Sequence, residues 1–356
     1  MATLLAFAAD GARLSDLRGL TDRLAALGGH ASTRSFHGRV LLVVTCAEPA
    51  LVHAELAASA QITQILDTAV PHPLASRAAS ARDSIVRVGD AEFGGGRPVL
   101  IAGPCSAENP EVLAETAAAV KAAGATMLRV GIFKPRTSPY AFQGLGRAGV
   151  SALSAVRAEY GLPVVSELLS VRDLDVLPGI ADMIQIGARN MQNYPLLAEV
   201  ARAGRPLLLK RGLAATVSEW LNAAEYLLAH GASDVVLCER GIRTFERTTR
   251  FTLDLGAVPV VKELSHLPVI VDPSHAAGAA RLVPSLSAAG LAAGADGLII
   301  EVHPRPHEAL SDGEQSLDLP AFAALADRLR ALGTALGRPL APAAEPDPAP
   351  ELVSVG

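Results

Sequence analysis

Short apolar runs that end in polar or charged residues recur along the chain from residue 98 onward. Segments rich in Ala and Leu, with helical spacing, separate them, for example 111–123, 147–160, 217–230 and 283–293. Alternation of such runs with helices is typical of parallel sheets, and eight similar units favour closure of the sheet over an open doubly wound one. The pattern therefore predicts an α/β fold, a (β/α)8 TIM barrel over residues 96–336. The eight runs read VLIAGPCS, TMLRVGIFK, PVVSELL, MIQIGARN, PLLLKRG, VVLCERG, PVIVDPSH and GLIIEVHP.

Residues 1–70 follow a different pattern. Strand-like runs at 3–8, 39–45 and 61–67, with a weaker one at 30–36, combine with helical spacing after residue 15 and over 49–60. The resulting order βαββαβ predicts a small ferredoxin-like α+β domain. We expect residues 71–95 to be a linker and lead-in to the barrel, and the Pro/Ala-rich residues 337–356 to be a disordered tail.

Composition and charge narrow the function classes. The net charge of −5 argues against a nucleic-acid binder, and no run of 18 or more apolar residues predicts a membrane span. The apolar N-terminal stretch lacks the basic residues of a signal peptide. Three cysteines give no disulfide framework. We therefore expect a cytoplasmic protein with neither nucleic acid nor membrane as a partner.

The residues at the ends of the eight runs are reactive or charged. In a barrel the carboxyl ends of the strands converge on one mouth, where active sites form, so we expect these side chains to share a site. The alternative is that they are ordinary polar caps on apolar strands. They are Cys105, Arg129, Glu167, Arg189, Lys210, Arg240, His275 and Glu301.

Four groups could bind a divalent metal, namely Cys105, His275, Glu301 and Asp312. A thiolate, an imidazole and two carboxylates suit a transition metal, Mn²⁺ first and Fe²⁺, Co²⁺ or Zn²⁺ otherwise. The competing interpretation of Cys105 is a small buried core residue.

The basic residues near the predicted mouth outnumber the carboxylates that could pair with them. Because buried cations need partners, we expect a substrate to supply the missing negative charge, either as two phosphorylated molecules or as one molecule with a phosphate and a carboxylate. In GIFKPRTSPY (131–140), which we call the hook, prolines hold Lys134 and Arg136 in one geometry; the alternative is a solvated loop. The basic set is Arg129, Lys134, Arg136, Arg189, Lys210, Arg211, Arg240 and Arg243.

Long motifs in the chain resemble those of 3-deoxy-D-arabino-heptulosonate 7-phosphate (DAHP) synthase of the type I-beta group. They read IAGPCS, FKPRTSPYAFQGLG, QIGARNMQN, LLKRG, LCERGIRTFE, DPSHAAG and EVHPRPHEALSDGEQSL. The resemblance covers residues 98–335, and residues 1–70 are similar to the regulatory domain of some members.

The resemblance implies a function for many of these residues. It implies condensation of phosphoenolpyruvate with erythrose 4-phosphate, the first step of the shikimate pathway, on a metal bound by the four ligands named above. Arg129, Lys134, Arg189, Lys210 and Arg240 would hold phosphoenolpyruvate, and Arg136, Thr137 and Ser138 the phosphate of the sugar. The metal would polarise the aldehyde, carbon 3 of phosphoenolpyruvate would attack it, and water would add at carbon 2 before phosphate leaves. Lys134 would donate a proton and Glu167 would orient or deprotonate the water.

The chain departs from the family pattern at Val130, Phe251 and Ala279-Ala280, where Gly, Asn and Arg-Arg are usual. We expect Val130 to add bulk beside the phosphoenolpyruvate site. These departures leave open a paralogue with another aldose phosphate as acceptor, including a secondary-metabolism enzyme. The sister 3-deoxy-manno-octulosonate 8-phosphate synthase has a different hook sequence. A catalytically silent regulatory partner is the remaining alternative, against which the complete metal set argues.

The resemblance also implies regulation and assembly. Related N-terminal domains bind tyrosine or phenylalanine and cover the barrel mouth, often within a tetramer. We therefore expect an aromatic amino-acid effector near His30 and Ser32, and a homo-oligomer, tetramer or dimer. The alternative is that His30 and Ser32 belong to an exposed edge strand.

Overall fold

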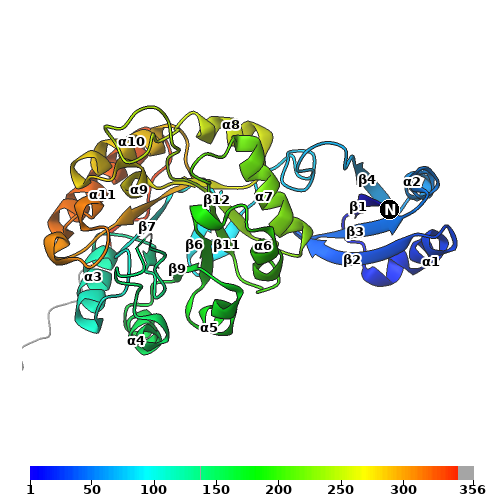
Figure 1. Cartoon of the computed structure of the whole chain (residues 1–356). Coiled ribbons are helices and arrows are strands. Elements are labelled where there is room, and N and C mark those ends of the chain that lie inside the picture. Colours follow the sequence, from blue (N-terminus) through cyan, green and yellow to red (C-terminus); the bar gives the residue numbers. More distant parts are fainter. Residues whose placement is uncertain (137, 344–356) are drawn as a thin grey trace, which may run out of the picture.

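Eight parallel strands close into a barrel in the computed structural model, which describes residues 1–136 and 138–343 (Figure 1). The predicted (β/α)8 fold is confirmed. In chain order the strands are β7 (Val99–Gly103), β8 (Met127–Arg129), β9 (Val164–Leu168), β10 (Met183–Ile186), β11 (Leu207–Lys210), β12 (Val235–Glu239), β13 (Val269–Val271) and β14 (Gly297–Glu301).

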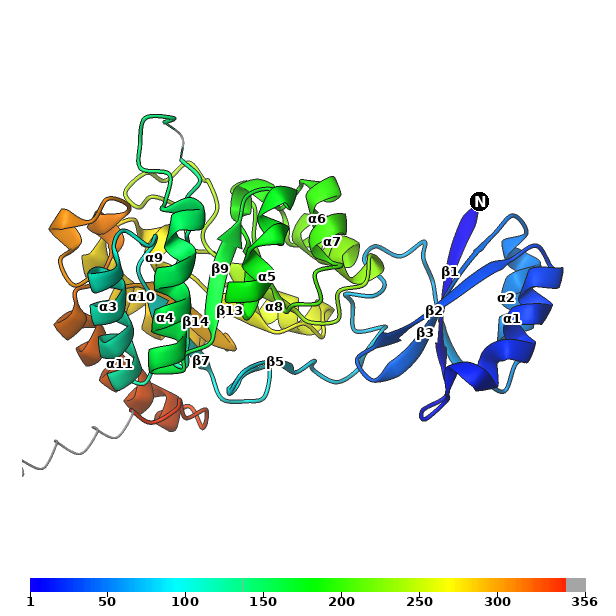
Figure 2. The same cartoon turned by 90° about the horizontal axis from the view of Figure 1, so that it is seen from below.

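Helices cover the outside of the barrel (Figures 1 and 2). They are α3 (Pro110–Ala122), α4 (Val150–Tyr160), α5 (Leu177–Ile180), α6 (Tyr194–Val200), α7 (Val217–Ala229), α8 (Ala257–Leu264), α10 (Val283–Ala292) and α11 (Leu319–Ala335). The short helix α9 (Pro273–Ala277) instead follows the carboxyl end of β13. Short 3-10 turns occupy Leu14–Leu17, Gly146–Gly149, Val171–Asp175, Ala188–Asn190, Ala280–Leu282, Pro306–Glu308 and Gly313–Gln315. Within the described ranges, no helix has the length and apolarity needed to cross a membrane.

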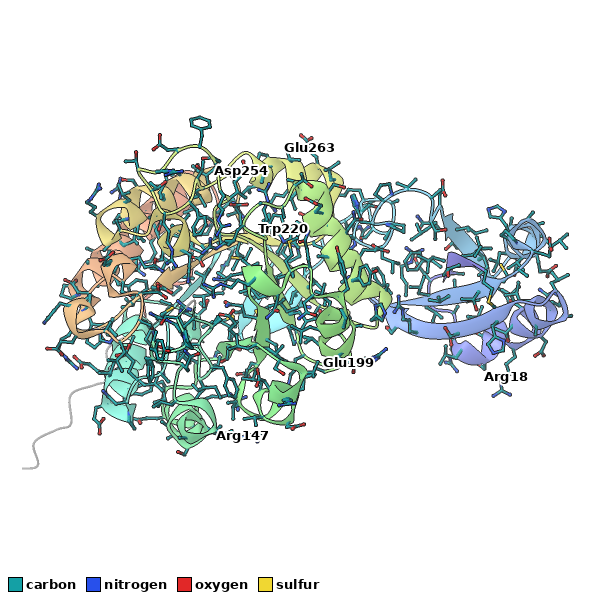
Figure 3. The ribbon with its side chains drawn as sticks, in the orientation of Figure 1. Arg18, Arg147, Glu199, Trp220, Asp254 and Glu263 are labelled. Carbon is teal, nitrogen blue, oxygen red and sulfur yellow. The ribbon has the colours of Figure 1, made fainter. Side chains whose placement is uncertain are left out.

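Helix α7 illustrates how the sequence sets these elements. Thr216 and Glu219 form a reciprocal capping box at its start, which satisfies two backbone N–H groups. Trp220 then lies fully buried between helix and barrel (Figure 3), where its indole N–H donates to the carbonyl of Leu209 at 3.2 Å. The helix is therefore fixed to β11 by a specific bond as well as by burial.

The interior of the barrel has an apolar layer below a charged one. The apolar layer consists of Ile101, Met127, Val165, Met183, Leu208, Val236, Cys238, Ile270 and Ile299. Side chains alternate between the two faces of a strand, so the next interior residue lies two positions further along. On seven of the strands that step leads to Arg129, Glu167, Gln185, Lys210, Arg240, Asp272 and Glu301. The strand period therefore gathers these polar groups at the carboxyl end.

A hairpin closes the other end of the barrel. Strands β5 (Val86–Val88) and β6 (Ala91–Phe93) pair antiparallel, and their buried side chains belong to the same cluster as the apolar interior layer. Residues 71–95, expected as a linker and lead-in, thus contain an element that packs into the barrel. Its burial removes the open end of the interior from water.

Residues 1–70 form the predicted βαββαβ unit. Its elements are β1 (Ala2–Ala8), α1 (Arg18–Ala26), β2 (His30–Phe36), β3 (Arg39–Cys46), α2 (Pro49–Ala58) and β4 (Ile62–Leu66), and the antiparallel sheet has the order β2-β3-β1-β4. Both helices pack on one face of the sheet around a separate core that includes Leu20, Leu24, Val52 and Leu56.

This domain contacts the barrel at the end where strands begin (Figure 2). Arg34 of this domain donates at 2.7 Å to the carbonyl of Ala229, the last residue of α7. In the connecting residues 71–95, the backbone N–H of Ser84 donates at 2.8 Å to the carbonyl of His266, just before β13. The contacts therefore lie away from the carboxyl ends of the strands, and in the described chain the domain does not cover the mouth.

Candidate active site

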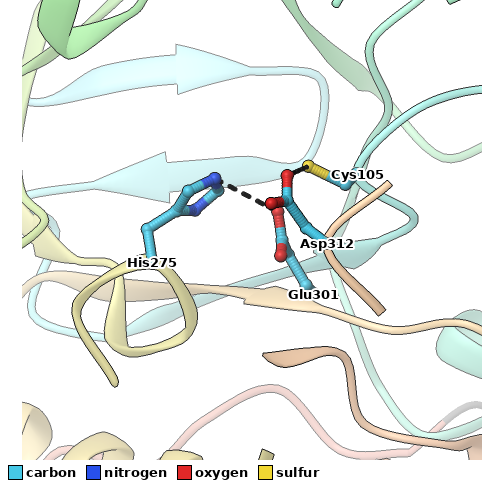
Figure 4. Close-up of side chains that lie close together, drawn as sticks. All are labelled: Cys105, His275, Glu301 and Asp312. Carbon is cyan, nitrogen blue, oxygen red and sulfur yellow. Dashed lines mark hydrogen bonds and ion pairs between the residues drawn. The ribbon is translucent and has the colours of Figure 1, made fainter. Parts of the chain in front are cut away.

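Four potential metal ligands converge at the carboxyl end of the barrel (Figure 4). Cys105 follows β7, His275 lies on α9, Glu301 ends β14, and Asp312 precedes the turn Gly313–Gln315. One ligand atom from each lies within 4.8 Å of the others. Asp312 has a φ of 50°, a left-handed conformation that Asp adopts more readily than most residues. The chain thus bends sharply at the residue that completes the cluster.

Asp272 fixes the orientation of His275. Its side chain caps α9 by accepting the backbone N–H of His275 at 2.9 Å, and its second oxygen lies 2.8 Å from Nδ1 of the same ring. The other ring nitrogen, Nε2, faces Glu301 at 3.3 Å. A carboxylate behind one nitrogen leaves the opposite nitrogen available to a metal.

The charge states of the cluster suit a cation. Burial lowers the pKa of His275, which favours the neutral imidazole. Burial alone would raise the pKa of Glu301, but His275 and Arg129 lower it to about 2. Burial raises the pKa of the Cys105 thiol to about 12, so binding of a metal by its sulfur would release a proton. Two carboxylates, a neutral ring and a thiol that can ionise are the donor set of a transition-metal site.

Two basic side chains touch the same cluster. Lys134 Nζ contacts the sulfur of Cys105 and lies 2.6 Å from Asp312, while Arg129 pairs with Glu301. Burial alone would lower the pKa of Lys134, but Cys105, Glu301 and Asp312 raise it above its usual value. Lys134 therefore carries a proton at neutral pH, because acidic groups outnumber cations around it.

A cavity of about 310 Å³ adjoins the cluster. Its lining includes Lys134, Arg136, Ser138, Glu167, Arg189, Lys210, Arg240, His275 and Asp312. Lys210 pairs with Asp272, whereas one buried nitrogen of Arg136 and one of Arg240 have no hydrogen-bond partner among the described residues. Buried donors are normally satisfied, so these two nitrogens indicate where an anion would bind.

The predicted hook is closed at its base and reaches over the cavity. The backbone N–H of Lys134 donates to the carbonyl of Gln143 at 2.9 Å, and that of Gly146 to Ile132 at 2.8 Å. Arg189 donates to the carbonyl of Pro135 at 3.2 Å, joining the hook to the turn Ala188–Asn190 that follows β10. Ser138 is exposed in the cavity lining, and Thr137 lies outside the described residues. The segment between β8 and α4 projects from the barrel in Figure 2.

Glu167 reaches the cavity from β9. The amide of Gln185 donates to it at 3.2 Å. A Cβ atom on Gly187 would lie only 2.0 Å from its Oε1, so glycine at that position leaves space for the carboxylate. The site therefore holds one acidic group, Glu167, that neither belongs to the cluster of four potential metal ligands nor pairs with a cation among the described residues.

Arg211 and Arg243 from the expected basic set do not line the cavity. Arg211 is adjacent to Lys210, so strand alternation turns it outward, where it pairs with Glu239 and Asp254 at 2.8 Å each. Arg243 is exposed. Fewer cations of the expected basic set are therefore available to a substrate in the cavity than the sequence predicted, since Arg211 and Arg243 are not among them.

Two of the three departures from the family pattern lie outside the cavity lining. Val130 is 1% exposed and packs in the core between strands and helices, so the expectation that it adds bulk beside the substrate site is wrong. Its neighbour Arg129 faces inward, and the strand period turns Val130 the other way. Ala279 and Ala280 are not in the lining, whereas Phe251 is.

Sequence reasoning missed several residues of the site. Asp272 and Gln185 could have been found, since each lies two positions after an interior apolar residue. Arg250 could not, because it lies in a segment without periodicity; it donates to Gln315 at 2.8 Å and contacts Asp312 at 3.3 Å. The side chain of Gln315 in turn donates to Glu301.

The two proposed regulatory residues lie on β2, an edge strand. His30 and Ser32 are exposed and two positions apart, opposite Thr45 and Val43 of β3. Their side chains share one face of the strand, as the alternation requires. A groove between this domain and the barrel, lined in part by His37, Arg39 and Arg77, does not include them.

A family model described as the DAHP synthetase I family matches residues 76–336. Phospho-2-dehydro-3-deoxyheptonate aldolase of Thermotoga maritima is 49% identical over 267 residues, which covers 75% of this chain and 79% of that protein. The crystal structure described as this aldolase (DAHP synthase) from Thermotoga maritima is 40% identical, with a TM-score of 0.75 over 96% of this chain and 100% of that one. A 2-dehydro-3-deoxyphosphooctonate aldolase of Syntrophotalea carbinolica is 34% identical over 66% of this chain and 90% of its own length.

Proposed function

The chain belongs to the DAHP synthetase I family, and from this premise we infer that it condenses phosphoenolpyruvate with erythrose 4-phosphate. The products are 3-deoxy-D-arabino-heptulosonate 7-phosphate and phosphate, and water is consumed. The observation that carries the inference is the position of the Cys, His, Glu and Asp cluster beside a cavity lined by cations. The same reaction is the first step of the shikimate pathway.

We propose that Cys105, His275, Glu301 and Asp312 hold a divalent metal, Mn²⁺ in preference to Fe²⁺, Co²⁺ or Zn²⁺. When bound, the metal would supply Lewis-acid polarisation of the aldehyde oxygen of the sugar. The residues fit this group because their ligand atoms already converge and Asp272 holds the ring of His275 from behind. Their convergence without rearrangement supports the assignment.

The cations would hold the two substrates side by side. Arg129, Lys134, Arg189, Lys210 and Arg240 would bind phosphoenolpyruvate, and the hook residues Arg136, Thr137 and Ser138 the phosphate of the sugar. The unpartnered nitrogens of Arg136 and Arg240 support two separate anion subsites. Fixed positive charge in a buried cavity binds the substrates and stabilises charge that develops during the reaction.

Lys134 and Glu167 would handle protons. Lys134 remains protonated in its contacts with Cys105 and Asp312, so it can donate a proton near the aldehyde oxygen. Glu167 lies across the cavity lining and has no cationic partner among the described residues, which suits a group that orients or deprotonates the water added at carbon 2. Lys134 would thus be the acid and Glu167 the base, and the two groups act on different atoms in one cavity.

The similarity to two kinds of aldolase raises the question of which sugar phosphate accepts phosphoenolpyruvate. Phosphooctonate aldolases, whose name indicates an eight-carbon product, are similar at 34% identity, against 49% for the heptonate aldolase. The hook sequence and the higher identity favour erythrose 4-phosphate. An assay of phosphate release with each sugar, described below, would also detect an enzyme of secondary metabolism that uses another aldose phosphate.

We further propose that residues 1–70 bind an aromatic amino acid near His30 and Ser32, that the chain forms a homo-oligomer, and that it acts in the cytoplasm. The exposure of both side chains on one face of an edge strand supports a ligand or a second subunit there. The three cysteines are free and buried, which fits a reducing compartment. Alanine at both positions should abolish inhibition by tyrosine or phenylalanine without changing uninhibited turnover.

The decisive experiment measures phosphate release from phosphoenolpyruvate with erythrose 4-phosphate and, separately, with arabinose 5-phosphate. The purified enzyme is assayed as loaded with Mn²⁺, after chelation, and after metal is added back. We expect turnover with erythrose 4-phosphate that chelation abolishes and Mn²⁺ restores. Absence of turnover with this sugar in metal-loaded protein would contradict the proposal.

Cys238 offers a matched control for Cys105. Both thiols are buried in the barrel, but Cys238 belongs to the apolar layer and Cys105 to the metal cluster. Cys105→Ala should lose metal binding and activity together, whereas Cys238→Ala should keep both and lose at most some stability to a small cavity. Equal loss of metal in both variants would contradict the ligand assignment.

A further inference from the structure

Arg240 differs from the other buried cations of the site. Arg129, Lys134 and Lys210 each pair with a carboxylate, namely Glu301, Asp312 and Asp272 in turn. Arg240 is 5% exposed and, among the described residues, forms no salt bridge and no side-chain hydrogen bond. A buried guanidinium without a carboxylate needs another source of orientation.

Phe251 provides that orientation. The guanidinium carbon of Arg240 lies 4.2 Å from the centre of the phenyl ring, within the range of a cation–π contact. The guanidinium of Arg250 lies 5.9 Å from the same ring. The ring thus contacts both cations at this side of the cavity, and all three residues are in its lining.

The ring itself is held by the backbone. The N–H of Phe251 donates at 2.9 Å to the carbonyl of Ala276, the residue after His275, and Thr252 and Ile242 exchange two backbone hydrogen bonds. A Cβ atom on Gly241 would lie 2.7 Å from the Cβ of Phe251, so only glycine allows the chain after Arg240 to pass this close. Phe251 therefore joins the segment after β12, which begins with Arg240, to α9, the helix that carries His275.

We propose that Phe251 is a positioning residue for Arg240. The aromatic face fixes the guanidinium plane and supplies no competing negative charge, so the N–H groups of Arg240 remain available to an anionic group of phosphoenolpyruvate. A carboxylate in the same place would have to be displaced or would repel the substrate. The proposal rests on the proposed function, because it assigns Arg240 to phosphoenolpyruvate.

The test compares three variants with the wild-type holoenzyme. Phe251→Leu removes the aromatic face and keeps apolar bulk, and Phe251→Tyr keeps the ring. Phe245→Leu is the matched control, since Phe245 lies in the same segment but is 97% exposed. Each protein is measured for the Kd of phosphoenolpyruvate by calorimetry, for the KM of both substrates and kcat, and for Tm.

We expect Phe251→Leu to raise the Kd and KM for phosphoenolpyruvate roughly tenfold, within the range of a desolvated cation–π contact. The KM for erythrose 4-phosphate should stay within about twofold, and Phe251→Tyr and Phe245→Leu should stay close to wild type. In an Arg240→Lys background, Phe251→Leu should raise the Kd for phosphoenolpyruvate only about twofold, because the planar guanidinium that stacks on the ring is gone.

A fall in Tm with an unchanged Kd for phosphoenolpyruvate would overturn the proposal, and so would an equal rise in both KM values. Either result would make Phe251 a packing residue only. Wild-type protein that fails to bind phosphoenolpyruvate would instead contradict the proposed function itself. If Phe251→Leu does not fold, Phe251→Met is measured in its place, since its flexible side chain fills the same space.

Discussion

Asp272 contacts His275 twice, through the backbone N–H at 2.9 Å and through Nδ1 of the ring at 2.8 Å. The same carboxylate pairs with Lys210. One buried acid therefore orients both the proposed metal ligand His275 and Lys210, which we propose binds substrate. The order of the site depends on Asp272, although it is not itself in the metal cluster.

Asp272→Asn should weaken metal binding about 10- to 100-fold. An amide side chain can donate to Nδ1 of His275 as well as accept from it, so it no longer selects the tautomer that leaves Nε2 free for the metal, and its hydrogen bond to the ring is weaker. Activity should recover partly at high Mn²⁺. Metal affinity is measured by competition with a chelator. Asp182→Asn is the control, since Asp182 is a half-buried carboxylate that pairs with Arg157 and lies just before β10, at the other end of the barrel. An unchanged metal affinity in Asp272→Asn would refute the orienting role.

Arg136→Ala should raise the KM for erythrose 4-phosphate about 10- to 100-fold, because the variant loses one or two hydrogen bonds to the charged phosphate of the sugar. The KM for phosphoenolpyruvate should change little, because Arg136 lies in the hook and not on the strands. Arg147→Ala is the charge-matched control, since Arg147 is exposed in the turn before α4 (Figure 3) and outside the cavity lining. If the KM for phosphoenolpyruvate rose more than that for erythrose 4-phosphate, Arg136 would belong to the phosphoenolpyruvate site instead.

Gly187→Ala should lower kcat at least about tenfold, since a methyl group would displace the carboxylate of Glu167 from the position in which we propose that it orients the water. Gly179→Ala is the control, because a Cβ atom there has nothing within 4 Å. Steady-state kinetics and Tm separate the two effects. If Gly187→Ala has full activity, then either Glu167 is not needed or the cavity accommodates its shift.

The contact between the connecting residues 71–95 and the barrel should weaken at low pH. Nε2 of His266 donates to the carbonyl of Leu74 at 2.8 Å, so in the neutral ring Nδ1 accepts from the hydroxyl of Ser84 at 2.7 Å. The ring of His37 lies 5.3 Å away. Burial lowers the pKa of His266 to about 4, with Arg77 and His37 acting in the same direction and Asp83 opposing them. Asp234 faces His37 and raises its pKa against burial.

Because the unfolded state binds the proton more tightly, the free energy of unfolding should fall as the pH drops from about 6.5 to about 4. The loss from His266 should reach at most about 3 kcal/mol and level off below that window. His266→Gln should flatten the pH profile, and His53→Gln, at an exposed position of α2, should not. Denaturant unfolding at several pH values measures this, and identical profiles for wild type and His266→Gln would contradict it.

Phe93→Ala should cost about 3–5 kcal/mol of stability, because the ring lies on β6 of the closing hairpin and is fully buried against the apolar layer of the barrel. Phe245→Ala, at an exposed ring, should cost almost nothing. Chemical denaturation of the two variants gives the comparison. Equal stabilities would mean that the hairpin β5–β6 contributes little to closing the barrel.

The sequence by itself determined the architecture and the identity of many polar groups in the site. Eight apolar runs predicted the barrel, and residues at their ends, such as Lys210 and Glu301, were named because the carboxyl ends of parallel strands meet. These inferences rest on local periodicity. Strand alternation, applied more strictly, would also have found Asp272 and excluded Arg211 and Val130.

Only the tertiary structure decided the partners of each group. Segments without periodicity carry Phe251 and Arg250, and no spacing in the sequence places a phenyl ring 4.2 Å from the guanidinium of Arg240. The same holds for the packing of the hairpin β5–β6 into the barrel and for the contact of His266 with Ser84. Hydrophobic periodicity fixes which face of an element is buried, whereas contacts between loops depend on where closure of the whole barrel brings their ends.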